Sequence, residues 1–551
     1  MRFSIITPVF NPPAALFEAC AASVLGQRFE DWEWILVDDA SSEPHVATML
    51  DRFIGDARLL VVRRQVNAGI VAASNDALAA ATGEFVVLLD HDDQLTSDAL
   101  STIDKALLSR PDTDYLYSDE DKFDADGRAF ELFLKPDWSP QRLRSQNYCC
   151  HVSVARRSVV AEVGGFHEGF DGSQDHDLIL RVTERARHVE HVPRVLYRWC
   201  VSPSSTAGDI AAKPYATEAG RRAVQAHCDR IGMPATVEHD TVPGTYRVRR
   251  TLPPGISASI VIPTRGTSGR VWGVERVFVE EAVRSIVERT TGIDFEIIVV
   301  VDDSTPTEVL ARLAEHDAVR LVRWEHPFNF SGKVNLGAAA ATGAVIALVN
   351  DDTEVIDGDW LHTMAAIALE ADVGAVGAKL LYSDGRLQHA GHLLNHNPLH
   401  VFHGADGEWP GPSNLLAVER EVSSVTAAVM VVRRDVWHEY DGFDPAFAVN
   451  FNDLDFCLRL RADGRRVIVT PHARLFHFES ITRETGATDA EVALLRQRWQ
   501  HELEHDPYGN PKLAIARSDW VPAAALSALA LPRSVAQEVR AFVKRRRRPH
   551  T

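Results

Sequence analysis

The sequence predicts an α/β fold built as two tandem domains, each with a largely parallel sheet. Short apolar runs that end in Asp or turn residues alternate with helical stretches. Continuous apolar runs are typical of buried parallel strands, and their alternation with helices indicates right-handed crossovers. The chain has 551 residues, more than the roughly 250–300 that one hydrophobic core serves.

A long-period repeat is the strongest sign of two domains. Four landmarks of the first half return in the same order in the second half, at offsets between 255 and 264 residues. A period this long indicates duplicated domains, since solenoid units run about 20–50 residues. The paired landmarks are Thr7-Pro8 with Ile262-Pro263, Asp38-Asp39 with Asp302-Asp303, Asn75 with Asn335, and Asp90-His91-Asp92 with Asn350-Asp351-Asp352.

The pattern predicts a first domain over 1–207, a connector over 208–256, a second domain over 257–485 and a helical, basic tail over 486–551. In the first half, apolar runs predict strands over 34–37, 59–62 and 85–89. Helical periodicity predicts helices over 14–25, 71–81, 98–109 and, in the connector, 214–230. Ligands of such sheets bind beyond the carboxyl ends of the strands, where both Asp-rich motifs fall.

Composition excludes several functional classes. The net charge is −19, which argues against a nucleic-acid partner, because such binding depends on Lys and Arg neutralising phosphates. The six cysteines form no C-x-x-C pair and are too few for a disulfide scaffold, so we expect no zinc ribbon and a reducing, cytoplasmic location. We see no signal peptide and no apolar run of the ~18 residues that a membrane span needs.

An acidic cluster at a strand end suits a divalent cation. Asp90 and Asp92 stand one residue apart after an apolar run, and Asp352 repeats the position. Carboxylate oxygens are the ligands that Mg²⁺ and Mn²⁺ prefer. The alternative is a helix N-cap provided by Asp93 or Ser97. For one cluster the two interpretations are evenly matched, and the repeat favours the metal.

The ordered motifs resemble family 2 glycosyltransferases with the GT-A fold, which are inverting enzymes that use nucleotide-diphosphate sugars. The resemblance covers nearly all of 1–207 and 257–485. The first half is similar to domains of tandem transferases in bacterial O-antigen synthesis, and the second half to rhamnosyltransferase-type domains. The motifs that carry it are Thr7-Pro8-x-x-Asn11, Val37-Asp38-Asp39, Asn67-x-Gly69, Tyr117-Ser118-Asp119-Glu120-Asp121, Gly164-Gly165-Phe166, Gln174-Asp175-His176-Asp177, Asn329-Phe330-Ser331, Gln388-His389-Ala390-Gly391, Asp441-Gly442-Phe443, Asn452-Asp453-Leu454-Asp455 and His477-Phe478-Glu479-Ser480.

The resemblance implies a role for each candidate residue. Asp175 and Asp453 would be the general bases that take the acceptor hydroxyl proton, although acidic residues there could also only stabilise a helix N-terminus. Mg²⁺ or Mn²⁺ would be held by Asp90, Asp92, Asp352 and His477. The expected substrate contacts are Pro8, Asn11, Asp39, Asn67, Asn75, Arg198, Trp199, Pro263, Arg265, Asp303, Asn335 and His389. One Asp of each pair, Asp38 or Asp302, is expected only to end a strand and order a turn.

The two halves depart from the family pattern in different places. The family often supplies a late His as a metal ligand, and His477 stands there in the second half. In the first half we match that position to Arg198, whose guanidinium cannot ligate a metal but could pair with a diphosphate. In the second half Asn350 replaces the first Asp of the metal motif. The second domain is therefore the better candidate for a metal-dependent enzyme.

Other motifs are weaker. His501-Glu502-Leu503-Glu504-His505 has the H-E-x-x-H spacing, but Asp506-Pro507 follows at once and a solvated helix face is expected. Five histidines over 389–403 are interpreted as a loop lining the second active site rather than as a metal cluster. Ser331-Gly332-Lys333 lacks the remaining residues of a P-loop. The basic end, 544–548, either docks on anionic lipid or is a disordered terminus.

These expectations combine into one function. The chain is expected to be a tandem glycosyltransferase that transfers sugars, rhamnose-type favoured, from nucleotide-diphosphate donors to a growing, lipid-linked surface polysaccharide such as O-antigen. We expect a cytoplasmic protein, with peripheral docking at the inner face of the cytoplasmic membrane left open. The alternative is that one or both domains are non-catalytic and bind a glycan or nucleotide sugar as a scaffold.

Overall fold

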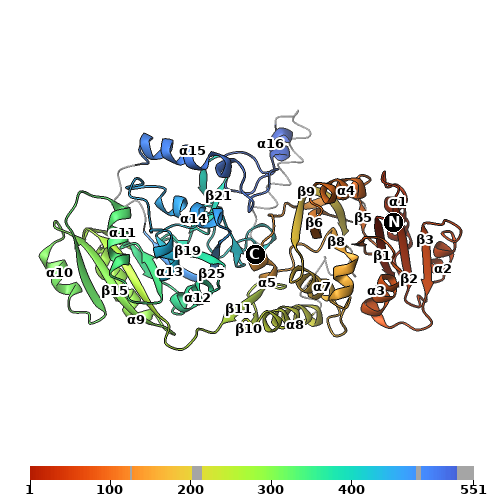
Figure 1. Cartoon of the computed structure of the whole chain (residues 1–551), viewed down its shortest axis with the longest axis horizontal. Helices are drawn as coiled ribbons and strands as arrows, with labels where there is room; N and C mark the ends of the chain where they lie inside the picture. The colour runs from red at the N-terminus through yellow and green to blue at the C-terminus, as the bar shows by residue number, and fades with distance from the viewer. Residues whose placement is uncertain (125–126, 202–213, 479–485, 530–551) are drawn as a thin grey trace. The chain divides into compact units, whose positions relative to one another are not determined.

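In a computed structural model, which describes residues 1–124, 127–201, 214–478 and 486–529, the chain folds as two compact units (Figure 1). One unit contains Met1–Trp138 and Arg142–Val248. The other contains Ser139–Gln141 and the described residues from Arg249 to Leu529.

The sheet of the first unit is mixed. Its strand order is β3-β2-β1-β4-β8-β6-β9-β5, with β7 paired to β6. The first four strands of this order are parallel, whereas β8 runs antiparallel to both of its neighbours. The predicted parallel part is therefore only half of the sheet. The strands are β1 (Phe3–Val9), β2 (Trp32–Asp38), β3 (Leu59–Arg63), β4 (Phe85–Leu88), β5 (Gln94–Leu95), β6 (Thr113–Phe123), β7 (Ala129–Phe133), β8 (Ser153–Arg156) and β9 (His188–Cys200).

Helices cover both faces of this sheet because its strands are apolar on both sides. Ile5 packs with Phe17 of α1 and Leu100 of α4 on one face. Its neighbour Ile6 packs with Val71 of α3 on the other face. The helices are α1 (Ala14–Leu25), α2 (Pro44–Asp51), α3 (Gly69–Ala80), α4 (Ala99–Ser109), α5 (Pro140–Ser145), α6 (Arg157–Glu162), α7 (Gln174–Thr183) and α8 (Pro214–Arg230).

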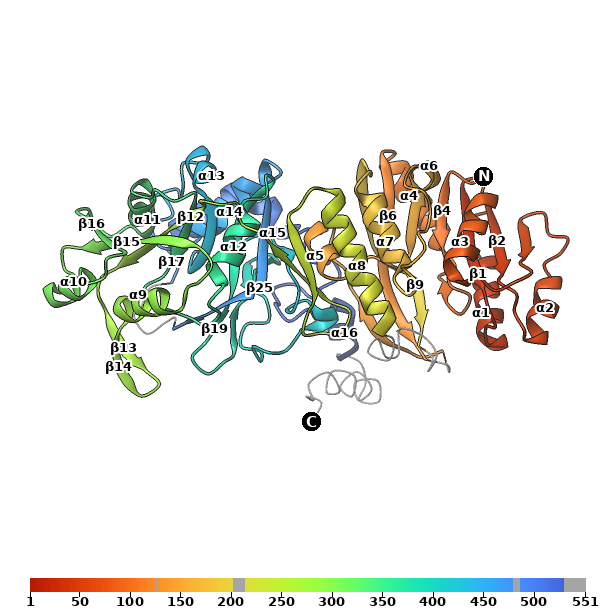
Figure 2. The ribbon, with the colours of Figure 1, turned by 90° about the horizontal axis from the view of Figure 1, so that it is seen from below.

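The segment predicted as a connector packs into the first unit. Helix α8 lies beside α7, as Figure 2 shows, and the hairpin β10 (Ala235–His239) and β11 (Tyr246–Arg250) follows it. Ala223, Val224 and Val237 are buried in the same core cluster as α7. These apolar side chains explain why 214–248 completes a core instead of forming a linker.

The main sheet of the second unit repeats the strand order of the first. Its order is β16-β15-β12-β17-β24-β19-β25-β18, with β20 paired to β19 and β23 to β25. This order confirms the duplication predicted from the repeat. The strands are β12 (Ser257–Thr264), β15 (Asp294–Asp302), β16 (Val319–Trp324), β17 (Val345–Val349), β18 (Thr353–Val355), β19 (Val373–Leu381), β20 (Leu387–His389), β23 (Arg420–Glu421), β24 (Val429–Arg433) and β25 (Arg466–His477), with two hairpins, β13 (Ser268–Val271) with β14 (Val274–Val277) and β21 (His392–Leu394) with β22 (Pro398–His400).

Helices again cover both faces of the second sheet. Helix α15 begins at a capping box formed by Thr488 and Glu491 and ends before Asp506-Pro507, as expected. Among the described residues, no helix has the length and apolarity to cross a bilayer. The helices are α9 (Phe278–Arg289), α10 (Thr307–Leu313), α11 (Phe330–Ala339), α12 (Trp360–Ala368), the 3₁₀ turn η2 (Pro412–Asn414), α13 (Arg434–Glu439), α14 (Asn452–Ala462), α15 (Asp489–Glu504) and α16 (Ala523–Leu529).

Candidate active sites

The second unit has an open pocket of about 340 Å³ at the carboxyl ends of β12 and β17. This is the edge where ligands of α/β sheets bind, and the volume lies within the range of small-molecule sites. Its lining brings together residues from distant parts of the sequence, among them Pro263, Arg265, Phe328, Lys333, Asn350, Asp351, Asp352, Gln388, His392, His400, Asp453 and His477.

Oxygen and nitrogen donors face one another on one wall of this pocket. Asp352 Oδ1 lies 3.3 Å from His477 Nε2, and Asn350 Nδ2 lies 3.4 Å from the same nitrogen. Asp351 accepts a 2.6 Å hydrogen bond from Thr264 Oγ1. Burial and repulsion from Asp352 raise the pKa of Asp351 to about 7. Two close carboxylates beside an imidazole fit a divalent cation, which would relieve that repulsion.

Asp453 lies in the first turn of α14 and lines the same pocket. Its Oδ1 accepts the Leu454 N–H at 2.8 Å and its Oδ2 accepts the Ala427 N–H at 3.0 Å. Two residues on, Asp455 is fully buried and pairs with Arg459 at 2.9 Å and Arg498 at 3.1 Å. The two carboxylates of the motif therefore differ, because Asp453 faces the pocket and Asp455 is an interior ion pair.

Cationic and aromatic groups lie at the β12 end of the pocket. The Arg265 guanidinium stacks 4.1 Å from the Phe328 ring. Lys333 donates to the Thr264 carbonyl at 2.8 Å and pairs with Asp302 at 2.9 Å. The predicted nucleotide contact Asp303 is different, since its side chain is 73% exposed and does not line the pocket.

The acidic loop of the first unit follows β4 as predicted. The surrounding protein and the neighbouring Asp92 raise the pKa of Asp90 to about 6, although solvent reaches its side chain. Asp93 is buried and accepts hydrogen bonds from the Tyr197 hydroxyl at 2.5 Å and the Cys200 N–H at 2.6 Å. Asp93 therefore joins the loop to β9, which leaves Asp90 and Asp92 as the metal candidates. The loop also reaches the predicted substrate contact Pro8, whose carbonyl oxygen lies 3.1 Å from His91 Nδ1.

Asp175 repeats the geometry of Asp453 in the first unit. Its Oδ1 accepts the His176 N–H at 2.8 Å, and Asn147 Nδ2 donates to Oδ2 at 3.0 Å. Burial raises the pKa of Asp175. As in the second unit, the carboxylate two residues further along the chain is structural, since Asp177 pairs with Arg181.

Two predicted substrate contacts, Asn75 and Asn335, make paired hydrogen bonds to backbone. Asn75 Nδ2 donates to the Phe166 carbonyl at 2.8 Å and its Oδ1 accepts the Phe166 N–H at 2.9 Å. Asn335 makes the same pair of bonds to Phe443, at 2.7 and 3.0 Å. Both ends of each amide are thus engaged by backbone, and a substrate role for them stays a prediction.

Other predicted nucleotide contacts of the first unit also meet backbone. Asp39 accepts the N–H groups of Ala68 and Gly69 at 3.0 and 2.8 Å and pairs with Arg64. Asn11 Oδ1 accepts the N–H groups of residues 42 and 43. Asn67 is exposed. As expected for one Asp of the pair, Asp38 orders a turn by accepting the Ser41 N–H at 2.9 Å.

Strand registers correct the matching of Arg198 with His477. In the first unit Gln94 pairs with Arg198 and Asp121 with Arg198. In the second unit the equivalent positions, Glu354 and Leu381, pair with Phe476. Arg198 therefore corresponds to Phe476, and Trp199 corresponds to His477. Matching the short motif at the end of β9 to the end of β25 by sequence alone is therefore wrong by one residue.

Arg198 and Trp199 have neighbours of their own. Arg198 Nε lies 3.3 Å from Asp121, and its guanidinium lies over Phe123. The Trp199 ring meets His151 edge-on, with centroids 4.9 Å apart. At the position of His477 the first unit therefore has Trp199, and an indole does not ligate metal.

Sequence reasoning missed several polar residues of these sites. Lys333 belongs to an incomplete phosphate-loop motif, which does not by itself predict a pocket residue. Its Nζ nevertheless reaches the Thr264 carbonyl at the end of β12. The repeat predicts Asp352, and not its neighbour Asp351, as a metal ligand. No motif predicts a role for His151, which stacks on Tyr197 with centroids 4.4 Å apart. The expected loop of histidines forms short strands, and His392 and His400 line the pocket. The basic end, 544–548, lies outside the described residues.

Comparison with protein families identifies both units. The model named "Glycosyl transferase family 2" matches residues 4–164, and "Glycosyltransferase like family 2" matches residues 257–501. The chain is 38% identical over 537 residues to the protein y4gI of Sinorhizobium fredii, and 36% identical over 525 residues to the O-antigen biosynthesis protein RfbC of Myxococcus xanthus.

Each of these matches covers 94% of the chain, but only 58% of y4gI and 40% of RfbC. Among solved structures, TarS of S. aureus in complex with UDP-GlcNAc is similar at a TM-score of 0.35 and 18% identity, over 41% of this chain and 66% of that one. At that TM-score the likeness says nothing about a ligand of this chain.

Proposed function

Because the chain belongs to glycosyltransferase family 2, we propose that it transfers sugars, with inversion, from nucleotide-diphosphate donors to a growing surface polysaccharide. The observation that carries this proposal is one pocket in the second unit. That pocket is lined by a carboxylate suited to a general base, Asp453, and by the donors Asp352 and His477.

The donor would bind across the β12 end of the pocket. Arg265 and Lys333 offer positive charge there, and Phe328 offers a flat apolar face. A divalent cation held by Asp352 and His477, with Asp351 beside them, would supply further positive charge to the departing diphosphate. Oxygen donors with one imidazole suit Mg²⁺ or Mn²⁺.

Asp453 would take the proton of the acceptor hydroxyl as that oxygen attacks the sugar carbon from the face opposite the diphosphate. A carboxylate has about four lone-pair sites, and backbone N–H groups of Leu454 and Ala427 engage two of them. These bonds fix the orientation of the carboxylate and leave the remaining sites for the acceptor. Orientation of this kind is what general-base catalysis requires.

In the first unit we assign the same roles to Asp175 as base and to Asp90 and Asp92 as cation ligands. Trp199 stands where the second unit has His477, so this site has one metal ligand fewer than the site of the second unit. An alternative role follows from that difference, in which the first unit binds the glycan without turnover and the second unit performs the transfer.

The acceptor and the location are proposed from the relatives. A similar protein is named for O-antigen biosynthesis, which supports a lipid-linked glycan acceptor at the inner face of the cytoplasmic membrane. Residues 544–548 would add basic contacts to anionic lipid. A rhamnose-type donor is our expectation from the resemblance of the second domain.

The test is sugar transfer by the full chain from a panel of nucleotide-diphosphate sugars, with Mn²⁺, with Mg²⁺ and with a chelator. Asp453→Asn and Asp175→Asn are compared with Asp435→Asn. Asp435 is a matched control, because it also lies in the first turn of a helix and accepts the next N–H at 2.8 Å, but is 75% exposed and outside the pocket.

We expect Asp453→Asn to lower kcat by about 10²–10⁴-fold, the usual contribution of a general base, and Asp435→Asn to leave it unchanged. Loss of a second product in Asp175→Asn would support two active domains. Full activity of both Asn variants would refute the two assigned bases, whereas nucleotide binding by the wild-type chain without any transfer would favour a binding scaffold.

A further inference from the structure

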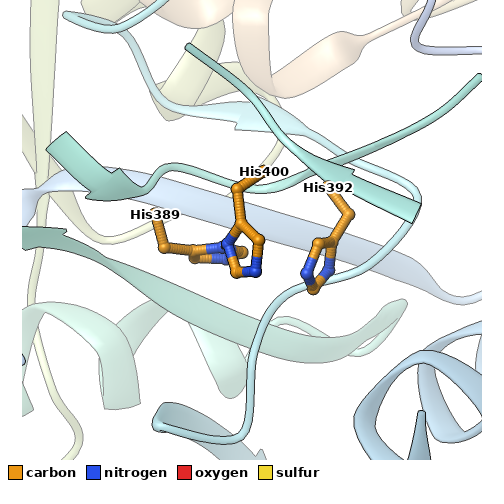
Figure 3. A group of neighbouring side chains, drawn as sticks. All are labelled: His389, His392 and His400. Carbon is orange, nitrogen blue, oxygen red and sulfur yellow. The ribbon is translucent and has the colours of Figure 1, made fainter. Parts of the chain in front are cut away.

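Three histidines of the second unit converge in a way that the transfer reaction does not require. His389 ends β20, His392 begins β21 and His400 ends β22. One ligand atom from each lies within 4.8 Å of the others, and Figure 3 shows the three rings facing one another. Ring centroids are 4.6–4.9 Å apart.

The local fold explains why these rings meet. His392 and His400 are directly paired across the antiparallel hairpin. Gly391 turns the chain between β20 and β21 at φ 92°, and a Cβ there would lie 2.7 Å from Val422. A side chain at this position would therefore displace the histidines on either side.

We propose that His389, His392 and His400 bind one transition-metal ion of the zinc type, separate from the cation at Asp352 and His477. Three imidazoles without a carboxylate suit Zn²⁺, Co²⁺ or Ni²⁺ rather than Mg²⁺ or Mn²⁺. A set of three protein ligands leaves a fourth position for water or substrate. His392 and His400 line the pocket, so that position opens toward it.

The geometry needs only small movements to bind the ion. Bonds of about 2.0–2.1 Å in a tetrahedral site put ligand nitrogens about 3.3 Å apart. His389 Nδ1 and His400 Nδ1 lie 2.8 Å apart, at hydrogen-bond distance, so this pair would open slightly while the third nitrogen approaches. The Thr426 N–H donates to His389 Nε2 at 3.2 Å. Metal binding would move the His389 proton from Nδ1 to Nε2 and release this long hydrogen bond.

An outer partner is already in place for His392. Its Nδ1 lies 3.2 Å from the Ser424 hydroxyl, and its backbone N–H donates to the Ser424 carbonyl at 2.9 Å. A hydrogen bond to the second ring nitrogen of a ligand fixes both its tautomer and its orientation. His389 and His392 are also buried, and burial lowers their pKa values below the ordinary value, as a metal ligand requires.

The experiment is Co²⁺ binding to the full chain after chelator treatment, followed by visible absorption of the tetrahedral ion and by elemental analysis. His392→Ala should lower the affinity by more than about 100-fold and Ser424→Ala by about 10–100-fold, the range for an outer partner. Asp352→Asn, which removes a ligand of the other cation site, should leave the absorption of tetrahedral Co²⁺ at the three histidines in place. The matched control is His501→Ala, which alters a close but exposed pair of rings, His501 and His505, with centroids 4.5 Å apart.

A wild-type chain that binds no stoichiometric Co²⁺ would overturn the proposal without any variant. Binding that survives His392→Ala, or that disappears in Asp352→Asn or His501→Ala, would overturn it as well. The readout is the metal itself. A failure here is therefore distinguishable from a failure of the proposed transfer reaction, which is measured with Mn²⁺ or Mg²⁺.

Discussion

Asn335 offers a quantitative test of whether the recurring Asn is a structural clamp or a substrate contact. Asn335→Ala removes two hydrogen bonds, of 2.7 and 3.0 Å, to the backbone of Phe443, and Phe443 is fully buried. At about 1 kcal/mol per bond, with an added penalty for buried backbone groups left unpaired, the free energy of unfolding should fall by about 2–3 kcal/mol. Gly442, at φ 61°, lets the loop approach Asn335 closely, since a Cβ there would lie 2.6 Å from Asn335 Oδ1.

The assay is thermal unfolding of the full chain beside calorimetric nucleotide binding. A loss of this size should lower the Tm of the second unit by about 4–12 °C, at about 2–4 °C per kcal/mol for a domain of 150–250 residues. Asn75→Ala should do the same to the first unit, through Phe166. Asn67→Ala, at an exposed position, is the control. An Asn335→Ala chain that keeps its Tm but binds nucleotide more weakly would refute the clamp.

Three further outcomes follow from buried charges. Asp455→Asn should lower the free energy of unfolding by about 3–5 kcal/mol, as for a broken buried ion pair. Asp453→Asn keeps one of its two backbone hydrogen bonds and should lower it by only about 1 kcal/mol; denaturant titration separates the two. Lys333→Met should destabilise the second unit and weaken nucleotide binding, because it removes the nearer of the two cations, Lys333 and Arg265, that pair with Asp302; unchanged values of both would contradict this. Burial alone would raise the pKa of Glu184, but hydrogen bonds from His227 and Arg230 lower it to about 2. Its stabilising effect is therefore present above the unfolded pKa of about 4.3 and lost as pH falls toward 2. Glu184→Gln should cost about 1–3 kcal/mol at pH 7 and little at pH 2, and an equal cost at both pH values would exclude the linkage.

The parallel half of each sheet could be predicted from sequence because its strands carry uninterrupted apolar runs. Helices α1 and α8 begin and end where the pattern placed them, and α3 begins two residues earlier. The other half of the sheet, in which β8 runs antiparallel to its neighbours, was missed because β6 and β9 contain polar motifs such as Ser118-Asp119-Glu120. These groups are buried by specific partners, including the Lys135–Glu120 pair at 2.7 Å, which periodicity does not reveal.

For the sites, the strand ends could be predicted but the function of individual side chains could not. Asp90 and Asp352 follow buried strands as expected, and the base candidates Asp175 and Asp453 each accept the N–H of the next residue. Asp39 and Asn335, whose substrate roles stay predictions, also make hydrogen bonds to backbone that no single motif can show. The error at Arg198 had a simpler cause: the offset between the halves is 260 residues at Asp92 and 278 at Asp175, so a short motif could be aligned one residue out.

The change in offset arises in one place. From the end of β6 to the start of β8, 29 residues intervene, whereas 47 separate the end of β19 from the start of β24. The longer connection contains the three converging histidines, and the sheet around it keeps the strand order of the shorter copy. Duplication thus left two sheets of the same strand order, and the connection after β19 is longer without disturbing that order. The second copy could acquire new ligands there while the first remained as it was.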